Sequence, residues 1–427
     1  MTSLEVDHAV VLANGLVGEL GEALSGAAGA AGIARAVIDP RGHGADELLT
    51  SVVGPGRLAL LRSKYKPSGK LTGYYELAAG DSRRTRRHVA VTWSLVGDSI
   101  HVSVLASPDD PAMPQLTRLH DLDHVHRALV DLDGIRWPDS PEDLLVRTVR
   151  YRPGQRHVLH VRAAGARTGV YLKTDPRDRA RHAVQLAGVL RTVPGLQRST
   201  VGVVPEVGYL AAESTAVWRE VQGPLLRRLL TTDPAAVPML AALGRGLRAV
   251  HEHAELEQPA ELARAAVHRE VAATARAGEH ITRLLPTTGR VYAALLHRVA
   301  DHLERLPAGP VRLVHGDLKT ENVVAVSGRR VRLLDLDRAG WGDPALDLAK
   351  LLADLRWWCA GDRRRAAVLA NGFRQGYGRA DQDRWARATL LATVFDLRYA
   401  ARRVAVHDPR WQALVREQVE RAARRPR

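Results

Sequence analysis

Residues 311–337 read VRLVHGDLKTENVVAVSGRRVRLLDLD, and this stretch decides the fold. Its first apolar residues predict a short strand that places Asp317 in the loop that follows. Asn322 lies at the end of that loop, and a hairpin turning at 327–328 returns the chain to Asp335. One loop and a neighbouring strand end therefore present two carboxylates and a carboxamide. Phosphoryl transfer uses such groups, because a carboxylate orients the acceptor hydroxyl and oxygen ligands hold magnesium on the nucleotide phosphates.

Three ordered motifs in and after this stretch carry a resemblance to a known family. HGDLKTEN at 315–322 resembles the HGDxxxxN loop of aminoglycoside phosphotransferases and of related choline and maltose kinases, which share the protein-kinase-like fold. DLD at 335–337 resembles the element equivalent to kinase D-F-G, and GDPALDLA at 342–349 resembles the family's GDPxxDLA block. The resemblance is tight over 311–352 and looser over 144–310.

The resemblance implies roles for five residues of the decisive stretch. Asp317 would accept or orient the acceptor hydroxyl, and Lys319 would reach the transferring phosphate. Asn322, Asp335 and Asp337 would be the magnesium ligands, and ATP with Mg²⁺ the cofactors. Each has a plainer alternative: Asp317 as a helix cap, Lys319 as a surface lysine, Asn322 as a turn brace, Asp335 as the partner of an arginine, Asp337 as a hydrogen-bond brace. The intervals between Asp317, Asn322 and Asp335 favour the catalytic interpretation for these three residues, while both readings stay open for Asp337 and Lys319.

Three neighbouring residues are expected to support the loop rather than touch substrate. His315 is expected to hold the loop in place. Asp343 and Asp347 are expected to position it and to cap the helix that begins near Pro344.

Lysine is scarce in this chain, so a lysine within a strand is informative. Only six lysines occur, and Lys173 ends an apolar run at the place where the related kinases keep the lysine that neutralises the α- and β-phosphates. The helix expected over 177–192 has no glutamate to pair with it. Asp178, Gln185 and Glu206 remain as possible substitutes.

Two further segments are assigned to the nucleotide by the same resemblance. Gly154-Gln155-Arg156 lies in a hairpin turn that would cover the phosphates, although a single glycine makes it a weak phosphate loop. Glu220-Val221-Gln222 would be the hinge between two lobes, whose backbone groups contact adenine. The alternative for the hinge is an ordinary turn from strand to helix.

Strand patterns precede helical patterns along the chain, which predicts an α+β protein with segregated layers. The resemblance makes this a two-lobed, protein-kinase-like fold: an antiparallel-sheet N-lobe at 141–222 and a helical C-lobe at 223–427. Residues 1–140 would form an N-terminal α+β cap, with a helix over 9–36.

The cap also looks like a copy of the N-lobe sheet. Tyr65-Lys66-Pro67 is answered by Tyr151-Arg152-Pro153, and Thr92 then stands where the second copy has Lys173. Chance similarity of two arginine- and proline-containing hairpins is the alternative.

Composition excludes several classes of protein. The chain has 427 residues and a formal net charge of +15, from 62 Lys and Arg against 47 Asp and Glu. Its arginines are dispersed without interleaved aromatics, so we expect a solvated basic surface and no nucleic-acid partner. Cys359 has no partner for a disulfide, and neither a basic leader nor a long apolar run indicates secretion or a membrane span. A cytoplasmic protein is expected, with its oligomeric state left open.

The expected partner is a small molecule that offers a hydroxyl. The related kinases build the acceptor pocket from helices of the second lobe, here about 345–405. An aminoglycoside-type antibiotic or related metabolite is one acceptor class, and a sugar or amino sugar is the alternative. The alternative that is not an enzyme is a module that binds a nucleotide without catalysis. The candidate acceptor residues are Trp357, Trp358, Asp383, Trp385, Asp396, Arg398 and Tyr399.

Overall fold

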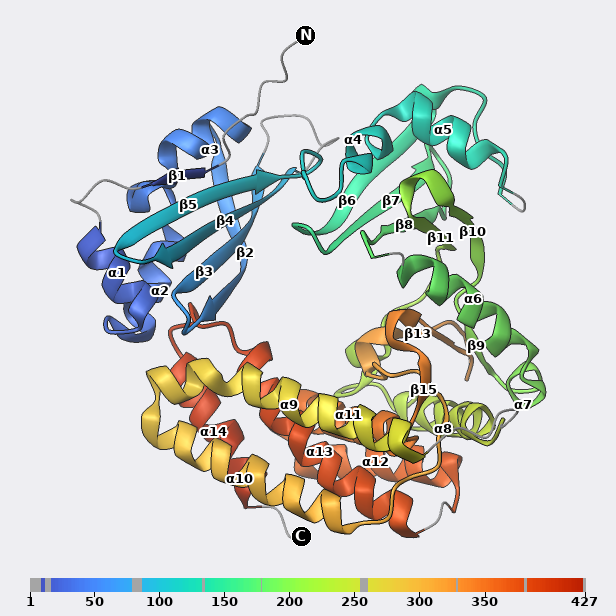
Figure 1. The fold of residues 1–427 in the computed structure, drawn as a ribbon. Helices are drawn as coiled ribbons and strands as arrows, with labels where there is room; N and C mark the ends of the chain where they lie inside the picture. The colour runs from blue at the N-terminus through green and yellow to red at the C-terminus, as the bar shows by residue number, and fades with distance from the viewer. Residues whose placement is uncertain are drawn as a thin grey trace.

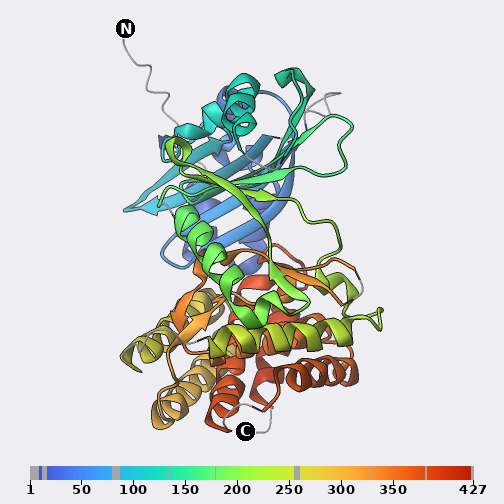
Figure 2. The same cartoon turned by 90° about the vertical axis from the view of Figure 1, so that its right-hand side faces the viewer.

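Two antiparallel sheets lie side by side above a layer of long helices (Figures 1 and 2). The computed structural model describes residues 9–11, 17–78, 87–132, 135–177, 179–253, 260–327, 329–379 and 382–424. The sheets come from the first half of the chain and the long helices from the second. The expected α+β architecture, with a sheet-containing N-terminal part and a helical C-terminal part, is therefore confirmed.

The strands are β1 (Ala9–Val11), β2 (Arg57–Lys66), β3 (Lys70–Ala78), β4 (Arg87–Val96), β5 (Ser99–Ala106), β6 (Leu144–Arg152), β7 (Arg156–Ala163), β8 (Val170–Thr174), β9 (Val201–Val203), β10 (Glu206–Leu210), β11 (Thr215–Arg219), β12 (Arg312–Val314), β13 (Val323–Ala325), β14 (Val331–Leu333) and β15 (Gly340–Gly342). The helices are α1 (Val17–Ser25), α2 (Gly29–Ile38), α3 (Asp46–Val53), α4 (Gln115–Leu119), α5 (Leu122–Val130), α6 (Arg179–Thr192), α7 (Pro194–Gln197), α8 (Ala236–Glu252), α9 (Ala260–Leu284), α10 (Pro286–Arg305), α11 (Ala345–Trp358), α12 (Arg363–Tyr377), α13 (Gln382–Arg403) and α14 (Trp411–Ala423). Two 3-10 helices matter for the site, η5 (Thr320–Asn322) and η6 (Leu336–Arg338).

The cap sheet has the strand order β1-β5-β4-β3-β2. Burial alternates along β5 because one face of the sheet packs against α1, α2 and α3 while the other does not. Two aromatic side chains on the covered face also bond to the helical layer: Tyr75 OH donates to the Val37 carbonyl at 2.7 Å, and Trp93 Nε1 donates to the His43 carbonyl at 2.9 Å.

The single helix expected over 9–36 is wrong. Residues 9–11 pair with β5 as strand β1, and a turn at 26–28 separates α1 from α2. Small residues fit a helix and a tight turn equally well, so the apolar spacing alone did not locate the break.

The N-lobe sheet has the order β10-β11-β8-β7-β6. Its register supports the similarity of the two sheets, because Lys173 pairs with Val158 while Thr92 pairs with Thr72. Val158 and Thr72 occupy matching places in the two similar hairpins. Thr92 thus holds the position in the cap sheet that Lys173 holds in the N-lobe.

Packing divides the chain earlier than residue 140. Helices α4 and α5 bury Leu116, Leu119 and Val125 against Leu159 and other residues of the N-lobe sheet, in a cluster separate from the main core. These helices precede 140 yet belong with the N-lobe. The packing favours a boundary between cap and N-lobe near residue 110.

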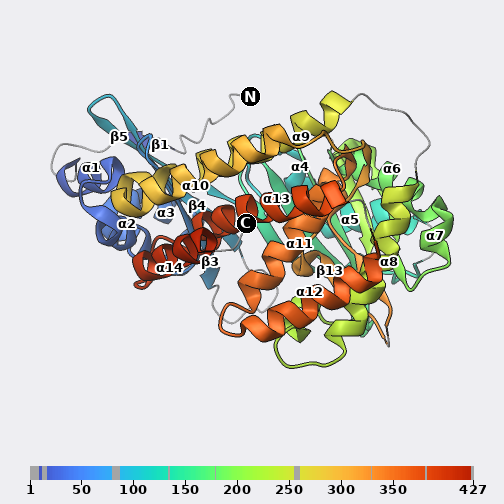
Figure 3. The same ribbon diagram turned by 90° about the horizontal axis from the view of Figure 1, so that it is seen from below.

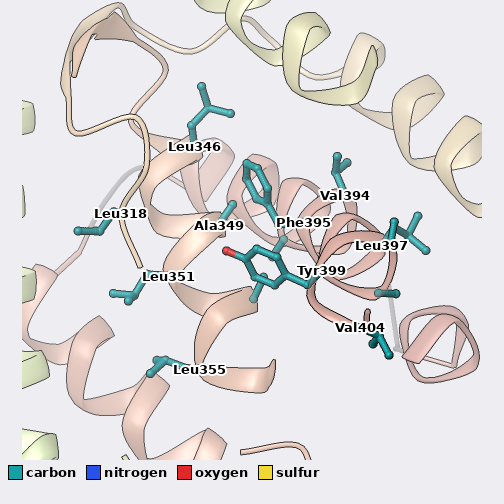
Figure 4. Packing of buried hydrophobic residues seen from close by; sticks show 14 of the residues in the cluster. Leu318, Leu346, Ala349, Leu351, Leu355, Val394, Phe395, Leu397, Tyr399 and Val404 are labelled. Atoms are coloured by element: carbon teal, nitrogen blue, oxygen red, sulfur yellow. The ribbon is translucent and has the colours of Figure 1, made fainter. Parts of the chain in front are cut away.

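The helical lobe is built around α11 and α13, which pack closely along their lengths. Figure 4 shows Leu346 and Ala349 of α11 with Phe395 and Tyr399 of α13 in this core. The hairpin expected near 312–336 is present as short strands, with β12 paired to β15 and β13 paired to β14. These strands place the decisive loop on the surface of the helical core.

The cap contacts the helical lobe as well as the N-lobe. Ser63 Oγ of β2 lies 2.8 Å from His407 Nδ1, in the segment between α13 and α14. Arg283 Nε at the end of α9 donates to the Ser25 carbonyl at 2.8 Å. These two contacts fix the cap at two places on the helical lobe, whose long helices α9 and α13 run across the view of Figure 3.

Among the described helices, none has a run of apolar residues long enough to cross a bilayer.

Candidate active site

The loop after β12 is held by a buried carboxylate. Asp347 of α11 accepts hydrogen bonds from the backbone N–H of His315 at 2.7 Å and of Gly316 at 2.8 Å. Gly316 has φ +72°, and a Cβ there would lie 2.1 Å from the Arg338 carbonyl oxygen. Only glycine fits this position. His315 Nε2 lies 2.9 Å from the Leu334 carbonyl, so His315 braces the loop as expected.

Asp347 itself is fully buried and needs partners. His251 of α8 lies 3.2 Å from it through Nε2, and its other ring nitrogen lies 2.9 Å from Tyr377 OH. Burial opposes ionisation of Asp347, but His251 and the backbone donors outweigh it and lower its pKa. Asp343 caps α11 through the Ala345 N–H, so both aspartates have supporting roles.

Asp317 lies at the centre of the loop, between two lysines. Lys319 Nζ lies 3.2 Å from Oδ2, and Lys350 Nζ lies 3.2 Å from Oδ1. Asn322 Nδ2 donates to the Asp317 carbonyl at 2.9 Å and lies 3.3 Å from its Oδ2. Burial raises the pKa of Asp317, yet Lys350 first and then Lys319 lower it far below the usual range. Asp317 is therefore ionised at neutral pH.

Lys350 is a site residue to which the sequence analysis assigned no role. It is buried on α11, where it also donates to the Gly316 carbonyl at 2.8 Å. Buried lysines are rare unless they are paired. The scarcity of lysine that pointed to Lys173 applies equally to Lys350, so the signal was present in the sequence.

Asp335 and Asp337 face the N-lobe sheet and bind its cations. Lys173 Nζ lies 2.6 Å from Asp335 Oδ1 and 2.5 Å from Asp337 Oδ1. Arg156 bonds to Asp337 Oδ2 and lies 3.6 Å from Asp335 Oδ2. Asp335 has φ +60°, an uncommon conformation for a residue with a side chain and one that recurs at functional sites.

The two carboxylates of the motif act on each other. Burial raises the pKa of Asp335, while Lys173 and Arg156 lower it to well below its ordinary value. Asp317 opposes this lowering, so the two carboxylates are close enough to interact. Asp317, Asn322 and Asp335 thus converge on one region between the N-lobe sheet and the helical lobe.

Two of the three substitutes proposed for the missing helix glutamate lie in the described part of the chain, and neither pairs with Lys173. Gln185 is exposed, and Glu206 is bound by Arg191. Asp178 lies outside the described residues. Lys173 is instead held directly by the two aspartates of the DLD element.

The turn of the β6–β7 hairpin is anchored from outside the N-lobe sheet. The Gly154 N–H donates to Asp110 Oδ2 at 2.8 Å, and Tyr151 OH donates to the same oxygen at 3.0 Å. This N–H is therefore engaged in the structure. Gln155 is exposed, and the Arg156 side chain is the group of this turn that reaches the aspartates.

The hinge segment leaves β11 through a position that requires glycine. Gly223 has φ +140°, and a Cβ there would lie 1.9 Å from the Ala325 carbonyl oxygen of β13. Upstream, the Glu220 N–H donates to the Gly169 carbonyl at 2.9 Å, and the Glu220 carboxylate lies 2.9 Å from His160 Nε2. The Glu220 N–H is thus engaged, which leaves Val221 and Gln222 as the candidate donors for adenine.

The oxygen donors at the site suit magnesium. Asn322 uses its amide nitrogen to bind Asp317, which leaves its amide oxygen for a cation beside the Asp335 carboxylate. Mg²⁺ prefers oxygen ligands and takes only one or two from the protein when it bridges phosphates. Among the described residues, no group of three or more His, Cys, Asp or Glu side chains is placed to hold a metal ion.

Three of the seven acceptor candidates from the sequence have polar partners in the structure. Asp396 is bound by Arg356, with NH2 to Oδ2 at 2.7 Å, and Arg398 is bound to Glu270. Tyr399 is buried and donates to the Lys350 carbonyl at 3.3 Å. These contacts hold α13 against its neighbours beneath the catalytic loop.

Residues 148–391 match the model of the phosphotransferase enzyme family. The GDP complex of aminoglycoside 2'-phosphotransferase-IIIa is 17% identical, covering 71% of this chain and 98% of that one with a TM-score of 0.49. Macrolide 2'-phosphotransferase from Brachybacterium faecium is 18% identical, covering 74% and 99% with a TM-score of 0.42. Plasmodium vivax ethanolamine kinase is 11% identical, covering 71% and 88% with a TM-score of 0.48. None of the curated proteins matches the chain.

Proposed function

The chain belongs to the phosphotransferase enzyme family, and on that premise we propose that it transfers the γ-phosphate of ATP to a hydroxyl group of a small molecule. The observation that carries the proposal is the convergence of Asp317, Asn322 and Asp335 with Lys173 from the opposite sheet. A structural brace would not need two ionised aspartates, a carboxamide and a half-buried lysine at one point between two lobes.

The chemistry is a displacement at phosphorus. The acceptor oxygen forms a bond to the γ-phosphorus while the bond from that phosphorus to the β–γ bridging oxygen breaks, and ADP leaves. The hydroxyl proton passes to the Asp317 carboxylate and then to solvent. Because Lys350 and Lys319 keep Asp317 ionised, it acts mainly by orienting the hydroxyl and accepts the proton late, as a loose transition state allows.

Cations from both lobes bind the nucleotide phosphates in this proposal. Lys173 and Arg156 exchange their bonds to Asp335 and Asp337 for bonds to phosphate oxygens when the nucleotide is present. Asn322 and Asp335 would hold Mg²⁺, with Asp337 beside them, and a bound ion would neutralise charge on the nucleotide phosphates. Lys319 lies at Asp317, where it can reach the transferring group.

Two classes of acceptor, and a third possibility without catalysis, are distinguished by experiment. An aminoglycoside-type antibiotic or related metabolite is the predicted acceptor, and a sugar or amino sugar is the alternative. A nucleotide-binding module without catalysis is motivated by Lys173, which has no helix carboxylate as partner among the described residues.

A coupled ADP-release assay over aminoglycosides, macrolides, sugars and amino sugars tests the proposal. With an acceptor found, Asp317→Asn is expected to lower turnover by about 10² to 10⁴ while ATP affinity stays within about twofold. Glu420→Gln on α14 is the matched control, because that carboxylate is exposed and bonds to the neighbouring Arg424. Equal turnover of Asp317→Asn and the wild type would refute the assignment, and ATP binding without acceptor-dependent ADP release would favour the module.

A further inference from the structure

A group of cations faces the active site without carboxylate partners. It consists of Arg62 and Lys64 of the cap strand β2, Arg150 and Arg152 of the N-lobe strand β6, and Arg402 of α13, and we call it the basic cluster. In the described part of the chain, no acidic side chain lies within ion-pair distance of any of the five. The cap, the N-lobe and the helical lobe each contribute at least one of these cations.

Strand geometry puts the N-lobe members on the face of the catalytic lysine. Arg150 pairs with Val158, which pairs in turn with Lys173. Side chains paired across antiparallel strands share a face, and residues two apart along a strand do too. Arg150 and Arg152 therefore lie on the Lys173 side of the sheet.

The cap members lie next to the contact between cap and helical lobe. Arg62 and Lys64 flank Ser63, whose side chain bonds to His407. Alternation along β2 turns both cations to the face opposite Ser63, and both are exposed. Arg402 lies near the end of α13, the helix whose Tyr399 bonds to Lys350 beneath Asp317. The cluster thus extends from the nucleotide side of the site to the acceptor side.

The five cations repel one another. The pKa is lowered at four of them: Lys64, Arg150, Arg152 and Arg402. Burial is the largest cause of the lowering and the charge of neighbouring cations is the next, and the pKa of Arg152 falls to about 10. Arg62 contributes to the lowering at all four. Positive charges gathered in this way without carboxylate partners favour the binding of an anion.

Nearby carboxylates do not neutralise the cluster. Asp335 is held by Lys173 and Arg156, and Glu270 is held by Arg398. Glu321 lies 3.3 Å from Arg403 NH2. Each is already bound to a closer cation, so the excess positive charge of the cluster remains.

We propose that the acceptor is an anionic hydroxyl compound, a small molecule carrying a phosphate or carboxylate group, and that the basic cluster binds this group with the cap strand as one wall of the acceptor site. The proposal rests on the proposed function and narrows its substrate class. Of the acceptor classes named above, the proposal therefore keeps the anionic metabolites and sugars and rejects a polycationic aminoglycoside, because the cluster would repel it.

Matched acceptors test the proposal in the ADP-release assay. Glucose, glucose 6-phosphate, glucuronate and glucosamine share one ring and differ in charge. We expect the anionic members to have kcat/KM at least about tenfold above glucose at low salt, with the advantage shrinking as salt rises. The Arg62→Ala/Lys64→Ala variant should lose that advantage through KM while the KM for ATP is unchanged. Arg57→Ala, an exposed arginine at the other end of β2, is the control.

Binding supplies a readout that does not depend on turnover. With AMP-PNP and Mg²⁺ saturating, pyrophosphate should bind the wild type at least about tenfold more tightly than the double variant, and Arg57→Ala should bind like the wild type. Equal binding by the wild type and the double variant would overturn the proposal. A higher kcat/KM for glucosamine than for the anionic sugars would also overturn it. So would tighter binding of a single-stranded DNA oligonucleotide than of pyrophosphate, or a double variant in which only the KM for ATP changes. Anion binding without ADP release from any acceptor would instead count against the proposed function and leave the anion site supported.

Discussion

At the scale of single residues, Asp317 is kept ionised by cations rather than by solvent. Lys350 is the largest of these influences, and it is buried while it contacts both the carboxylate and the loop backbone. Its role is to position and to charge Asp317. Without Lys350, the remaining cations would only partly offset the effect of burial, and the pKa of Asp317 would rise.

We therefore predict a change in the pH profile of Lys350→Met. The wild type should show no acid limb from Asp317 between about pH 5 and 7, because its folded pKa lies far below the usual value of about 3.9. In Lys350→Met the pKa of Asp317 rises, so the acid limb of kcat/KM should move upward into the measurable range. Lys350→Arg should restore part of the wild-type profile. A profile of unchanged shape in Lys350→Met would show that Lys350 serves packing alone.

The same pKa has a consequence for stability. A folded pKa below the unfolded value means that ionised Asp317 favours the folded protein above about pH 4. That contribution is lost as the pH falls toward the folded pKa.

At the scale of elements, the catalytic loop was the most predictable part of the protein. The order of its histidine, glycine and aspartate in the sequence is constrained by the structure. The loop must pass close to the Arg338 backbone and also present the Asp317 carboxylate. The Asp110 bond to the Gly154 N–H had no such signal, because it joins residues that are distant in sequence. The helix break at 26–28 was missed for the opposite reason, since small residues satisfy several local conformations.

The Gly316→Ala substitution tests the construction of the loop. It adds a Cβ at φ +72° and against a backbone oxygen, so the free energy of unfolding should fall by about 1–3 kcal/mol, with a loss of turnover. Gly361→Ala is the control, because a Cβ there meets nothing within 4 Å. Thermal unfolding followed by circular dichroism measures both. A Gly316→Ala variant as stable as Gly361→Ala would contradict the tight approach.

At the scale of the whole molecule, the buried apolar residues of the cap and of the helical lobe form one continuous cluster. Leu24 and Trp93 of the cap belong to it together with Leu351 and Phe395 of the helical lobe. The outer face of the N-lobe sheet has a separate cluster with α4 and α5. The cap is therefore expected to unfold with the helical lobe rather than before it.

The Trp93→Ala substitution measures that coupling. Removing this fully buried side chain should cost about 3–5 kcal/mol. In hydrogen exchange, amides of α11 and α13 should then lose protection to the same extent as amides of β3 and β4, because the two parts open together. Trp341→Ala is the comparison, since that side chain is exposed. Loss of protection confined to the cap would mean that it opens alone.

The register of the two sheets has a consequence for stoichiometry. Thr92, which lies 3.1 Å from Thr72 between the hydroxyl oxygens, fills the place of Lys173 with a neutral side chain. If the two sheets are copies, as the sequence predicts, the cap sheet lacks the charge that we propose binds the nucleotide phosphates. A calorimetric titration should count one nucleotide per chain, because the neutral Thr92 leaves the cap sheet as a support for its neighbour rather than a second binding site.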